Sequence, residues 1–574
     1  MTVETAFRVL PHVQFNTVFM QNKEKEFQGE FLIETSWEVC NKIGGIYTVL
    51  SSKAAELKTQ FGDNLIFIGP DVWTADKPSP DFIERKTLLK SASSKLQLPD
   101  DLKIRVGRWD VPGNPIAILV NYNSLMPEMN SIFGEMWNDY GVDSLHAYGD
   151  YTASCAFAVA AAKVIIALNA YLKKDSKKLI THFDEWTTGM GLLYIKKHLP
   201  EAATVFTTHA TSIGRSICSN GKPLYEYFTA YNGDQMAREL NMEAKHSLEK
   251  KAAENADCFT TVSEVTAQEC AQLLSVTPQV VTPNGFTGSL VPKGTRYTAE
   301  RKRARSRVLT VAEALTGKEF SDDTFIVATS GRNEYRNKGL DLYIDSLAQL
   351  GRAKVRERKV LALILVPAWV AGPNAGLLER LDGKEANPWP DFSTHRLNNE
   401  DGDAVFLRLL QLQETMKGTN VSFMYVPCYL DGRDGVLELS YYQALTAADI
   451  TVFPSYYEPW GYTPLESVAF GVPTVTSNKS GFGQWVDSTL GSGILKSGVA
   501  VVERTDTNYE NAKQNIANIL DSVMSYNDSE KKKADKAARN TASKASWSLF
   551  IKYYDEAFRY AMAAAAKRNQ QKSK

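Results

Sequence analysis

Motifs built from cysteine or histidine are missing from this chain. Its six cysteines show no CxxC spacing, and its seven histidines show neither HxH nor HExxH spacing. Zinc sites need such closely spaced ligands, so we expect no metal site. Scattered cysteines in a chain of 574 residues are typical of reduced, buried thiols and therefore of a cytoplasmic protein. The cysteines are Cys40, Cys155, Cys218, Cys258, Cys270 and Cys428.

Strong net charge and long apolar runs are also missing. The formal net charge is −1, which gives no electrostatic reason to bind nucleic acid or an acidic membrane. The longest apolar stretch, 156–172, is interrupted by Lys163 and Asn169 and is too short to span a bilayer. No basic segment followed by an apolar core opens the chain, so we expect no secretory leader. We therefore expect neither nucleic acid nor a membrane as a partner.

Short strands alternate with helices along most of the chain, whose length suggests at least two domains. After an irregular extension, residues 1–30, the expected strands are 31–33, 64–70, 117–122, 178–183, 204–210 and 258–263. Helical spacing occurs at 46–61, 150–172, 187–198, 235–256 and 264–274. This alternation predicts a parallel sheet with helices on both faces, and hence an N-terminal α/β domain, residues 31–300.

A second alternating series follows residues 281–307, whose glycines, prolines and basic run we interpret as the linker. Its expected strands are 325–330, 360–366, 420–426, 449–453, 472–476 and 499–502, with a helix at 340–351 and a surface loop at 370–402. These elements predict a C-terminal α/β domain, residues 310–545. Terminal helices are expected at 506–526, 529–541 and 547–567, and the last segment, 546–574, is long enough to return to the first domain. Two such domains create an interdomain cleft, where ligands often bind.

Residues 453–471 (FPSYYEPWGYTPLESVAFG) form a strand end, a turn and a helix start. We expect Thr463 as the N-cap, Pro464 in the first turn and Glu466 in a capping box. The free N–H groups at such a helix start bind phosphates in open α/β sheets. Glu458, in the turn, is a second carboxylate close to these groups.

Two further loops offer groups for a diphosphate. Residues 331–339 (GRNEYRNKG) follow the strand 325–330 and place the cations Arg332, Arg336 and Lys338 beside glycines. A diphosphate needs such fixed positive charge, although a solvated surface loop has the same composition. In residues 41–45 (NKIGG) a Gly-Gly pair opens a helix and lets the backbone approach a ligand.

Polar and aromatic residues near strand ends are further candidates. His182 and His209 end successive strands on the side of the sheet where ligands bind, and Arg215 follows His209. A single histidine there is usually structural, but the pair favours a functional role. The aromatic residues around Glu458 serve either in the core or as a stacking face for a base or sugar; they are Tyr441, Tyr442, Tyr456, Tyr457, Trp460 and Tyr462. The DxD pattern 401–403 lies in a loop, and we interpret it as a turn.

These motifs together resemble the glycogen synthases of fungi and animals. Residues 41–47 (NKIGGIY), 207–211 (TTHAT) with Arg215, 331–339 and 455–466 occur in that family's order, and the likeness extends from Phe31 to Val502. The resemblance implies a GT-B fold, in which two Rossmann-like, doubly wound domains face a deep cleft. It also implies retaining transfer of glucose from a nucleotide-diphosphate glucose, preferably UDP-glucose, to the non-reducing 4-OH of an α-1,4-glucan, with no metal and no pyridoxal cofactor.

The resemblance also assigns roles to individual residues. The residues that it assigns to the phosphates are Lys42, Gly44, Gly45, Arg332, Lys338, Gly461, Tyr462 and Thr463. The residues that it assigns to the donor glucose are His209, Arg215, Trp460 and Gly461. For the nucleoside, it implies that Tyr441 stacks on the base and that Glu466 binds the ribose. The groups assigned to catalysis are Glu458, His209, Arg332 and Lys338.

Glu458 is the expected stabiliser of the reacting sugar. A cation-like sugar forms as the bond to the diphosphate breaks, and a nearby carboxylate stabilises it. Since Glu466 is assigned to the ribose, it is not available as the second carboxylate of a hydrolase-type pair. We therefore expect displacement on one face of the sugar, with Glu458 acting electrostatically and the leaving phosphate helping to deprotonate the acceptor.

The chain departs from the family pattern in three places. Asp184 stands where the family usually has histidine, which exchanges a possible cation near the cleft for an anion. The helical insertion that builds the family's tetramer is shortened, to about 369–412, so a homo-oligomer is open but the family's assembly is not carried over. Lysines dominate the segment 529–546 that corresponds to an arginine-rich regulatory helix. Because lysine cannot reproduce bidentate phosphate binding, activation by glucose 6-phosphate is not carried over either.

Other functional classes remain open from the sequence. An ADP-glucose-dependent, starch-type synthase would differ in the base pocket around Tyr441, and a nucleotide-sugar epimerase of the same fold would need no glucan. A phosphorylase would need a pyridoxal-binding lysine, for which we find no motif. The presence of four residues together argues against a silent glucan-binding or regulatory protein: Arg332, Lys338, Glu458 and His209. No GxGxxG follows a first strand, which argues against a Rossmann dehydrogenase.

Overall fold

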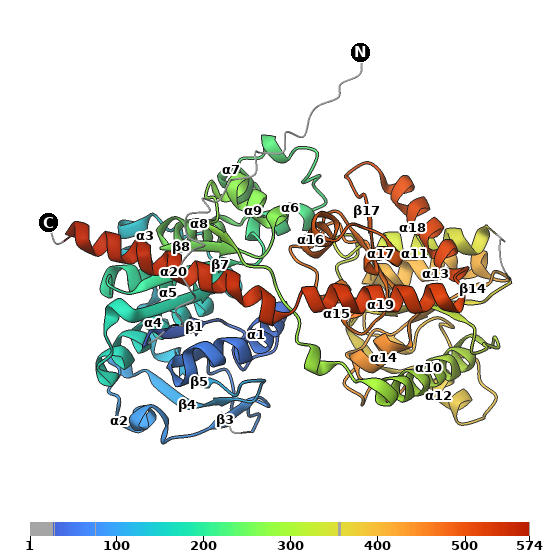
Figure 1. Ribbon diagram of the computed structural model, residues 1–574, viewed down its shortest axis with the longest axis horizontal. Coiled ribbons are helices and arrows are strands. Elements are labelled where there is room, and N and C mark those ends of the chain that lie inside the picture. Colours follow the sequence, from blue (N-terminus) through green and yellow to red (C-terminus); the bar gives the residue numbers. More distant parts are fainter. Residues whose placement is uncertain (1–26, 28, 75, 354–356, 573–574) are drawn as a thin grey trace, which may run out of the picture.

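The computed structural model describes residues 27, 29–74, 76–353 and 357–572, so the expected extension 1–30 lies almost entirely outside the described residues. Figure 1 shows two lobes side by side, each built around one large sheet. The predicted α/β class with two parallel-sheet units is confirmed.

The N-terminal sheet has nine strands in the order β3-β4-β5-β2-β1-β6-β7-β8-β9. The strands are β1 (Phe31–Thr35), β2 (Leu65–Pro70), β3 (Phe82–Glu84), β4 (Lys103–Trp109), β5 (Ile116–Asn121), β6 (Leu179–Asp184), β7 (Ala203–Thr208), β8 (Cys258–Thr261) and β9 (Val280–Val281). Strands β3 and β4, which the sequence analysis did not predict, add an antiparallel edge. All other pairings are parallel, so the loops that follow β1, β6 and β7 meet at one edge.

The helices of this lobe are α1 (Gly45–Phe61), α2 (Ala92–Lys95), α3 (Met129–Tyr140), α4 (Tyr151–Leu172), α5 (Trp186–His198), α6 (Ser212–Ser219), α7 (Gly233–Glu239), α8 (Glu243–Asn255) and α9 (Glu264–Glu269). The helix expected at 235–256 is two helices, because Asn241 takes a left-handed φ of 53° between them. Among the described residues, α4 alone is long and apolar enough to cross a membrane, but 67% of its apolar window is buried inside the lobe. It packs there as a core helix.

The C-terminal sheet has six parallel strands in the order β14-β11-β10-β15-β16-β17. They are β10 (Phe325–Ser330), β11 (Val360–Leu365), β14 (Val421–Tyr425), β15 (Ile450–Phe453), β16 (Thr474–Ser477) and β17 (Val499–Val502). The helices are α10 (Gly294–Thr316), α11 (Leu340–Arg352), α12 (Ala375–Leu381), α13 (Ala404–Met416), α14 (Tyr441–Ala447), α15 (Tyr462–Ala469), α16 (Gly481–Thr489), α17 (Ile494–Ser497), α18 (Tyr509–Met524), α19 (Asp528–Lys544) and α20 (Trp547–Lys572).

Two segments that were expected to be irregular are ordered. The basic run assigned to the linker belongs to α10, whose Arg301 donates hydrogen bonds to the carbonyl oxygens of Thr446 and Ala448 at 2.6 and 2.9 Å. The arginines of α10 thus bind C-terminal carbonyls of α14, and the linker ends before Gly294. The expected surface loop 370–402 contains α12 and a small antiparallel sheet of β12 (Val370–Pro373) and β13 (His395–Leu397).

Helix α20 crosses back from the C-terminal lobe, as predicted, and lies along the N-terminal sheet (Figure 1). The ring of Phe558 packs against Phe61 of α1 with centroids 6.0 Å apart, and Gln60 donates a hydrogen bond to Asp555 at 3.1 Å. The helix therefore joins the two lobes through a continuous apolar core.

Candidate active site

The candidate site lies where both sheets reverse their winding. The parallel strands follow the order 3-2-1-4-5-6-7 in the N-terminal sheet and 3-2-1-4-5-6 in the C-terminal sheet, so the switch points fall between β1 and β6 and between β10 and β15. Open α/β sheets bind ligands outside the carboxyl ends of the strands at such points. The loops there carry Glu38, Gly44, Asp184, Glu185, Arg332, Lys338 and Glu458.

Lys338 and Glu458 form an ion pair at the switch point of the C-terminal lobe. The Nζ atom of Lys338 lies 2.6 Å from Oε2 of Glu458, and their side chains are 15% and 13% exposed. The backbone of Glu458 is fixed as well, because its carbonyl oxygen accepts a hydrogen bond from Gly481 at 3.1 Å. Two residues assigned to catalysis are therefore in direct contact.

Arg332 and Arg215 approach each other from opposite lobes. The carboxylate of Glu334 lies 3.0 Å from Arg332 and 4.0 Å from Arg215. Partial burial and the nearby Arg215 lower the pKa of Arg332, which remains a cation at any physiological pH. Glu334, which the sequence analysis left without a role, therefore screens two cations that come from different lobes.

His209 is held by two carboxylates of its own lobe. Its Nε2 lies 2.9 Å from Oδ1 of Asp184, and its backbone N–H donates to Oε1 of Glu185 at 3.0 Å. Glu185 takes a left-handed φ of 67° at the end of β6, a strained conformation for a residue with a side chain. The sequence analysis missed Glu185, although its place directly after the strand that ends at Asp184 was a signal.

The helix start at Gly44 is occupied by a carboxylate of the chain. Oε2 of Glu38 accepts hydrogen bonds from the backbone N–H groups of Gly44 and Tyr47, at 2.8 Å each. The Gly44 N–H, expected to be available to the sugar phosphate, is therefore engaged, because a carboxylate gains the same stabilisation at a helix start as a phosphate. The backbone at Gly45 borders open space, and Lys42 lies over the ring of Tyr47 at 5.5 Å.

Helix α15 begins earlier than predicted. Gly461, not Thr463, is its N-cap, and no side chain caps it. Gly461 has a φ of 112°, and a Cβ atom there would lie 2.7 Å from Oγ of Ser480, so glycine is required. The capping box with Glu466 is wrong for the same reason. The first turn of α15, with Tyr462 and Thr463, therefore follows a glycine N-cap that offers no capping side chain.

Tyr441 and Glu466, the two residues assigned to the nucleoside, lie together. The hydroxyl of Tyr441 is 2.9 Å from Oγ of Ser330, and its ring packs against Tyr442 at 5.3 Å. Tyr442 donates a hydrogen bond to Oε1 of Glu466 at 3.0 Å. Burial raises the pKa of Glu466 to about 7, against the opposing effect of the tyrosine hydrogen bonds. The carboxylate thus belongs to a tyrosine cluster rather than to the helix cap.

Several predicted candidates lie outside the site. Contrary to the donor-sugar assignment, the Trp460 ring is buried between Phe482 and Phe550, with centroids 6.0 and 6.2 Å away. His182 is buried inside the sheet, with Nε2 2.7 Å from Oγ1 of Thr207. The turn at 401–403 is confirmed, because Asp403 caps α13 by accepting from Phe406 at 2.8 Å.

Tyr456 and Tyr457 contribute to the contact between the lobes. Leu224 donates a backbone hydrogen bond to the Tyr456 hydroxyl at 3.0 Å, and the Tyr457 hydroxyl donates to Glu269 at 3.0 Å. These two aromatic residues of the 453–471 segment are therefore buried against the N-terminal lobe rather than open to a base. The turn that carries Glu458 is anchored on both lobes.

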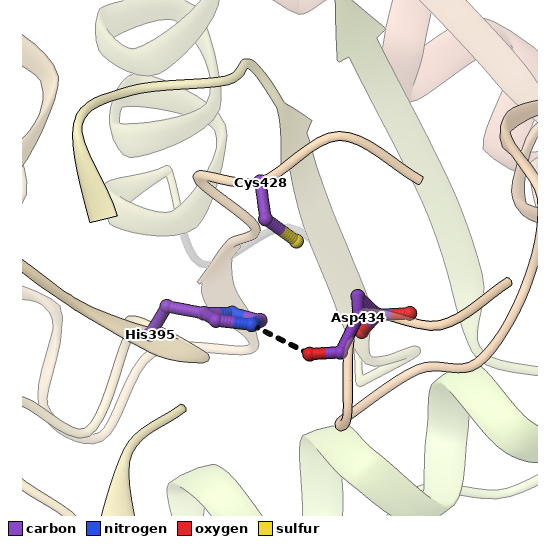
Figure 2. Close-up of side chains that lie close together, drawn as sticks. All are labelled: His395, Cys428 and Asp434. Atoms are coloured by element: carbon purple, nitrogen blue, oxygen red, sulfur yellow. Dashed lines mark hydrogen bonds between the residues drawn. The ribbon is translucent and has the colours of Figure 1, made fainter. Parts of the chain in front are cut away.

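One cluster with metal-ligand chemistry lies in the C-terminal lobe. Figure 2 shows the ring of His395 bonded to the main-chain carbonyl oxygen of Asp434, at 3.0 Å, with Cys428 beside them. The other nitrogen of His395 lies 2.9 Å from Oγ1 of Thr394. The Asp434 carboxylate accepts from three backbone N–H groups, those of Val436, Leu437 and Glu438. The His395 ring and the Asp434 carboxylate are therefore engaged in hydrogen bonds within the protein, and these bonds hold the loop around Asp434. The predicted free thiols are confirmed, and Cys428 alone among the described cysteines is partly exposed.

Comparisons with known proteins find relatives that match most of the chain. The glycogen synthase family model matches residues 34–384 and 375–573. The chain is 27% identical over 558 residues to a glycogen [starch] synthase of Caenorhabditis elegans, which covers 86% of this chain and 82% of that protein. It is 28% identical over 562 residues to glycogen [starch] synthase isoform 2 of Saccharomyces cerevisiae, which covers 84% and 79%.

A solved structure agrees at the level of the fold. The catalytic domain of starch synthase IV from Arabidopsis thaliana, solved with ADP and acarbose, matches with a TM-score of 0.56 and 14% identity. The match covers 93% of this chain and 100% of that chain. The expected GT-B architecture is thereby confirmed.

Proposed function

Because the chain belongs to the glycogen synthase family of glycosyltransferases, we propose that it transfers glucose from UDP-glucose to the non-reducing 4-OH of an α-1,4-glucan, with retention at the anomeric carbon. The observation that carries the proposal is the contact of Lys338 with Glu458, at 2.6 Å, beside Arg332. A cation for the leaving phosphate and an anion for the sugar are then adjacent, as the two ends of a breaking glycosyl–phosphate bond require.

Donor binding exchanges the partners of the C-terminal cations. A diphosphate between Arg332, Lys338 and the start of α15 takes over the charge that Glu334 and Glu458 balance in the unliganded chain. Lys338 then turns to the phosphate and leaves the Glu458 carboxylate beside the sugar. The ion pair is thus a resting state of the site.

The transfer step follows from this arrangement. As the bond between the anomeric carbon and the phosphate oxygen breaks, Arg332 and Lys338 stabilise the negative phosphate, and Glu458 stabilises the positive sugar. The acceptor 4-OH attacks the same face and gives its proton to the leaving phosphate oxygen. His209 and Arg215 hold the sugar from the N-terminal lobe, so the site is complete only when both lobes contact the donor.

We propose that the reaction needs neither a metal ion nor pyridoxal phosphate, since Arg332 and Lys338 supply the positive charge at the phosphates. The choice of uracil as the donor base rests on the resemblance around Tyr441. A cytoplasmic location, with glycogen as the partner, follows from the same proposal.

The test is glucose incorporation by purified protein from UDP-, ADP- and GDP-glucose, each with and without added glycogen. Incorporation into glycogen, fastest from UDP-glucose, supports the proposal. Preference for ADP-glucose identifies a starch-type synthase, and UDP release without need of glycogen indicates an epimerase. No incorporation from any donor defeats the proposal.

A further inference from the structure

Asp184 is a buried carboxylate that the reaction described above does not use. It ends β6, its side chain is 0% exposed, and its Oδ1 atom lies 2.9 Å from Nε2 of His209.

The contact decides which nitrogen of His209 carries the proton. An ionised carboxylate only accepts hydrogen bonds, so Nε2 must be the donor. Burial alone would raise the pKa of Asp184, but the neighbouring His182, His209 and Lys53 outweigh it and hold the pKa well below its ordinary value. In the neutral ring Nδ1 is then an acceptor, and no hydrogen bond to Nδ1 is found among the described residues.

A buried lysine balances the charge of Asp184. Lys53 is fully buried, with Nζ 2.5 Å from Oε1 of Glu34 and 4.3 Å from the centroid of the Tyr554 ring. Burial raises the pKa of Glu34 to about 8, although Lys53 opposes the shift. Lys53 also favours the ionised form of Asp184. A buried charge persists only with such a partner.

We propose that Asp184 is a positioning residue for glucosyl transfer: it holds the Nε2 proton of His209, so that Nδ1 accepts a hydrogen bond from a hydroxyl group of the donor glucose. The part that concerns the donor rests on the proposed function. The state of the His209 ring does not, so it is tested separately.

The ring state is measured by ¹⁵N NMR of protein labelled only in its seven histidines, at pH 8. A difference spectrum against His209→Gln assigns the His209 signals. We expect the Nε2–H tautomer in the unchanged protein and a mixture of both tautomers in Asp184→Ala. An Nδ1–H tautomer in the unchanged protein, or an Asp184→Ala spectrum without change at His209, overturns the proposal whether or not the protein makes glycogen.

The catalytic part is measured with Asp184→Ala and Asp184→Asn. An asparagine keeps the shape but can donate as well as accept, so both changes release the tautomer. We expect kcat to fall about 10²-fold, with the KM for UDP-glucose changed less than about threefold. Asp257→Asn is the control, because Asp257 is a buried carboxylate at the other end of the same sheet, 2.9 Å from Lys196; its kcat stays unchanged. An unchanged kcat in folded Asp184→Asn refutes the positioning role.

Discussion

The two lobes hold their halves of the site in different ways. In the N-terminal lobe, His209 is almost buried, and carboxylates of the same lobe bind both its ring and its backbone. In the C-terminal lobe, the Arg332 side chain is 56% exposed, and Lys338 is paired with Glu458, the carboxylate to which we assign the stabilisation of the sugar. In the proposed mechanism, the partners of His209 stay in place during the reaction, whereas the substrate replaces the partners of Arg332 and Lys338.

In the proposed mechanism, this difference explains how the candidate site can be stable without substrate and reactive when substrate is bound. Buried hydrogen bonds position a ring at no cost during the reaction. In the proposed exchange, the ion pairs of Arg332 with Glu334 and of Lys338 with Glu458 keep the cations from repelling each other until a diphosphate takes the place of the carboxylates. Changes in the two lobes should therefore have different signatures.

Lys338→Ala should have the largest effect. It removes the cation next to the leaving phosphate, and we expect kcat for glucose transfer to fall about 10³-fold. The control is Lys384→Ala, which removes an exposed lysine 3.9 Å from Asp382 on the same lobe. Steady-state assays with glycogen check both variants. A loss of kcat of less than tenfold for Lys338→Ala would contradict the claim that Lys338 moves from Glu458 to the leaving phosphate.

Trp460→Phe should change stability much more than catalysis. The indole packs between Phe482 and Phe550 rather than against a sugar, so a smaller ring leaves a cavity, at about 1–3 kcal/mol. We expect the apparent Tm to fall by about 2–5 °C, with the donor KM within about threefold. A tenfold rise in the KM for the donor without a change in Tm would show that Trp460 contacts the donor sugar after all.

The smallest expected effect is a pH dependence that differs between the lobes. Burial raises the pKa of Glu34 and Glu249 to about 8 and of Glu269 to about 7 in the N-terminal lobe; in the C-terminal lobe the described site contributes Glu466, at about 7. The folded lobe binds these protons more tightly than the unfolded chain, so the stabilisation is complete below about pH 4.5 and is lost as the pH rises through 7 to 8.

Hydrogen exchange at pH 6 and pH 8.5, corrected for intrinsic rates, measures this effect by lobe. We expect protection to decrease with pH more in the sheet around β6–β8 than around β10–β15. Equal changes in both lobes would show that the buried carboxylates of the N-terminal lobe do not set its stability.

The sequence predicted the elements that carry the site better than it predicted side-chain partners. Strand β10 matches the expected 325–330 in full, because a buried strand is a short apolar run with clear ends. The linker was predicted to extend too far along the chain, because the basic run of α10 was taken as part of it. In the structure, an arginine of this run binds carbonyl groups at the end of α14. Periodicity does not report such long-range partners.

The candidate residues show the same limit. Glu458 and Lys338 were both predicted, but their contact joins two separate loops, and neither loop determines it alone. Glu38 was missed because its function at the Gly44 helix start depends on how the preceding loop folds back. Trp460 was assigned to the sugar by resemblance, and only packing shows where its ring points.

The most direct test of the exchange is the affinity for UDP of Glu458→Gln, measured by calorimetry at fixed ionic strength. The glutamine amide cannot form an ion pair with Lys338, so less free energy is spent in freeing Lys338 for the diphosphate. We therefore expect UDP to bind about three- to tenfold more tightly, together with a large loss of turnover. Asp382→Asn, which changes an exposed acidic partner of Lys384, should leave the affinity as it is. Unchanged or weaker UDP binding by Glu458→Gln would contradict the claim that the diphosphate replaces Glu458 as the partner of Lys338.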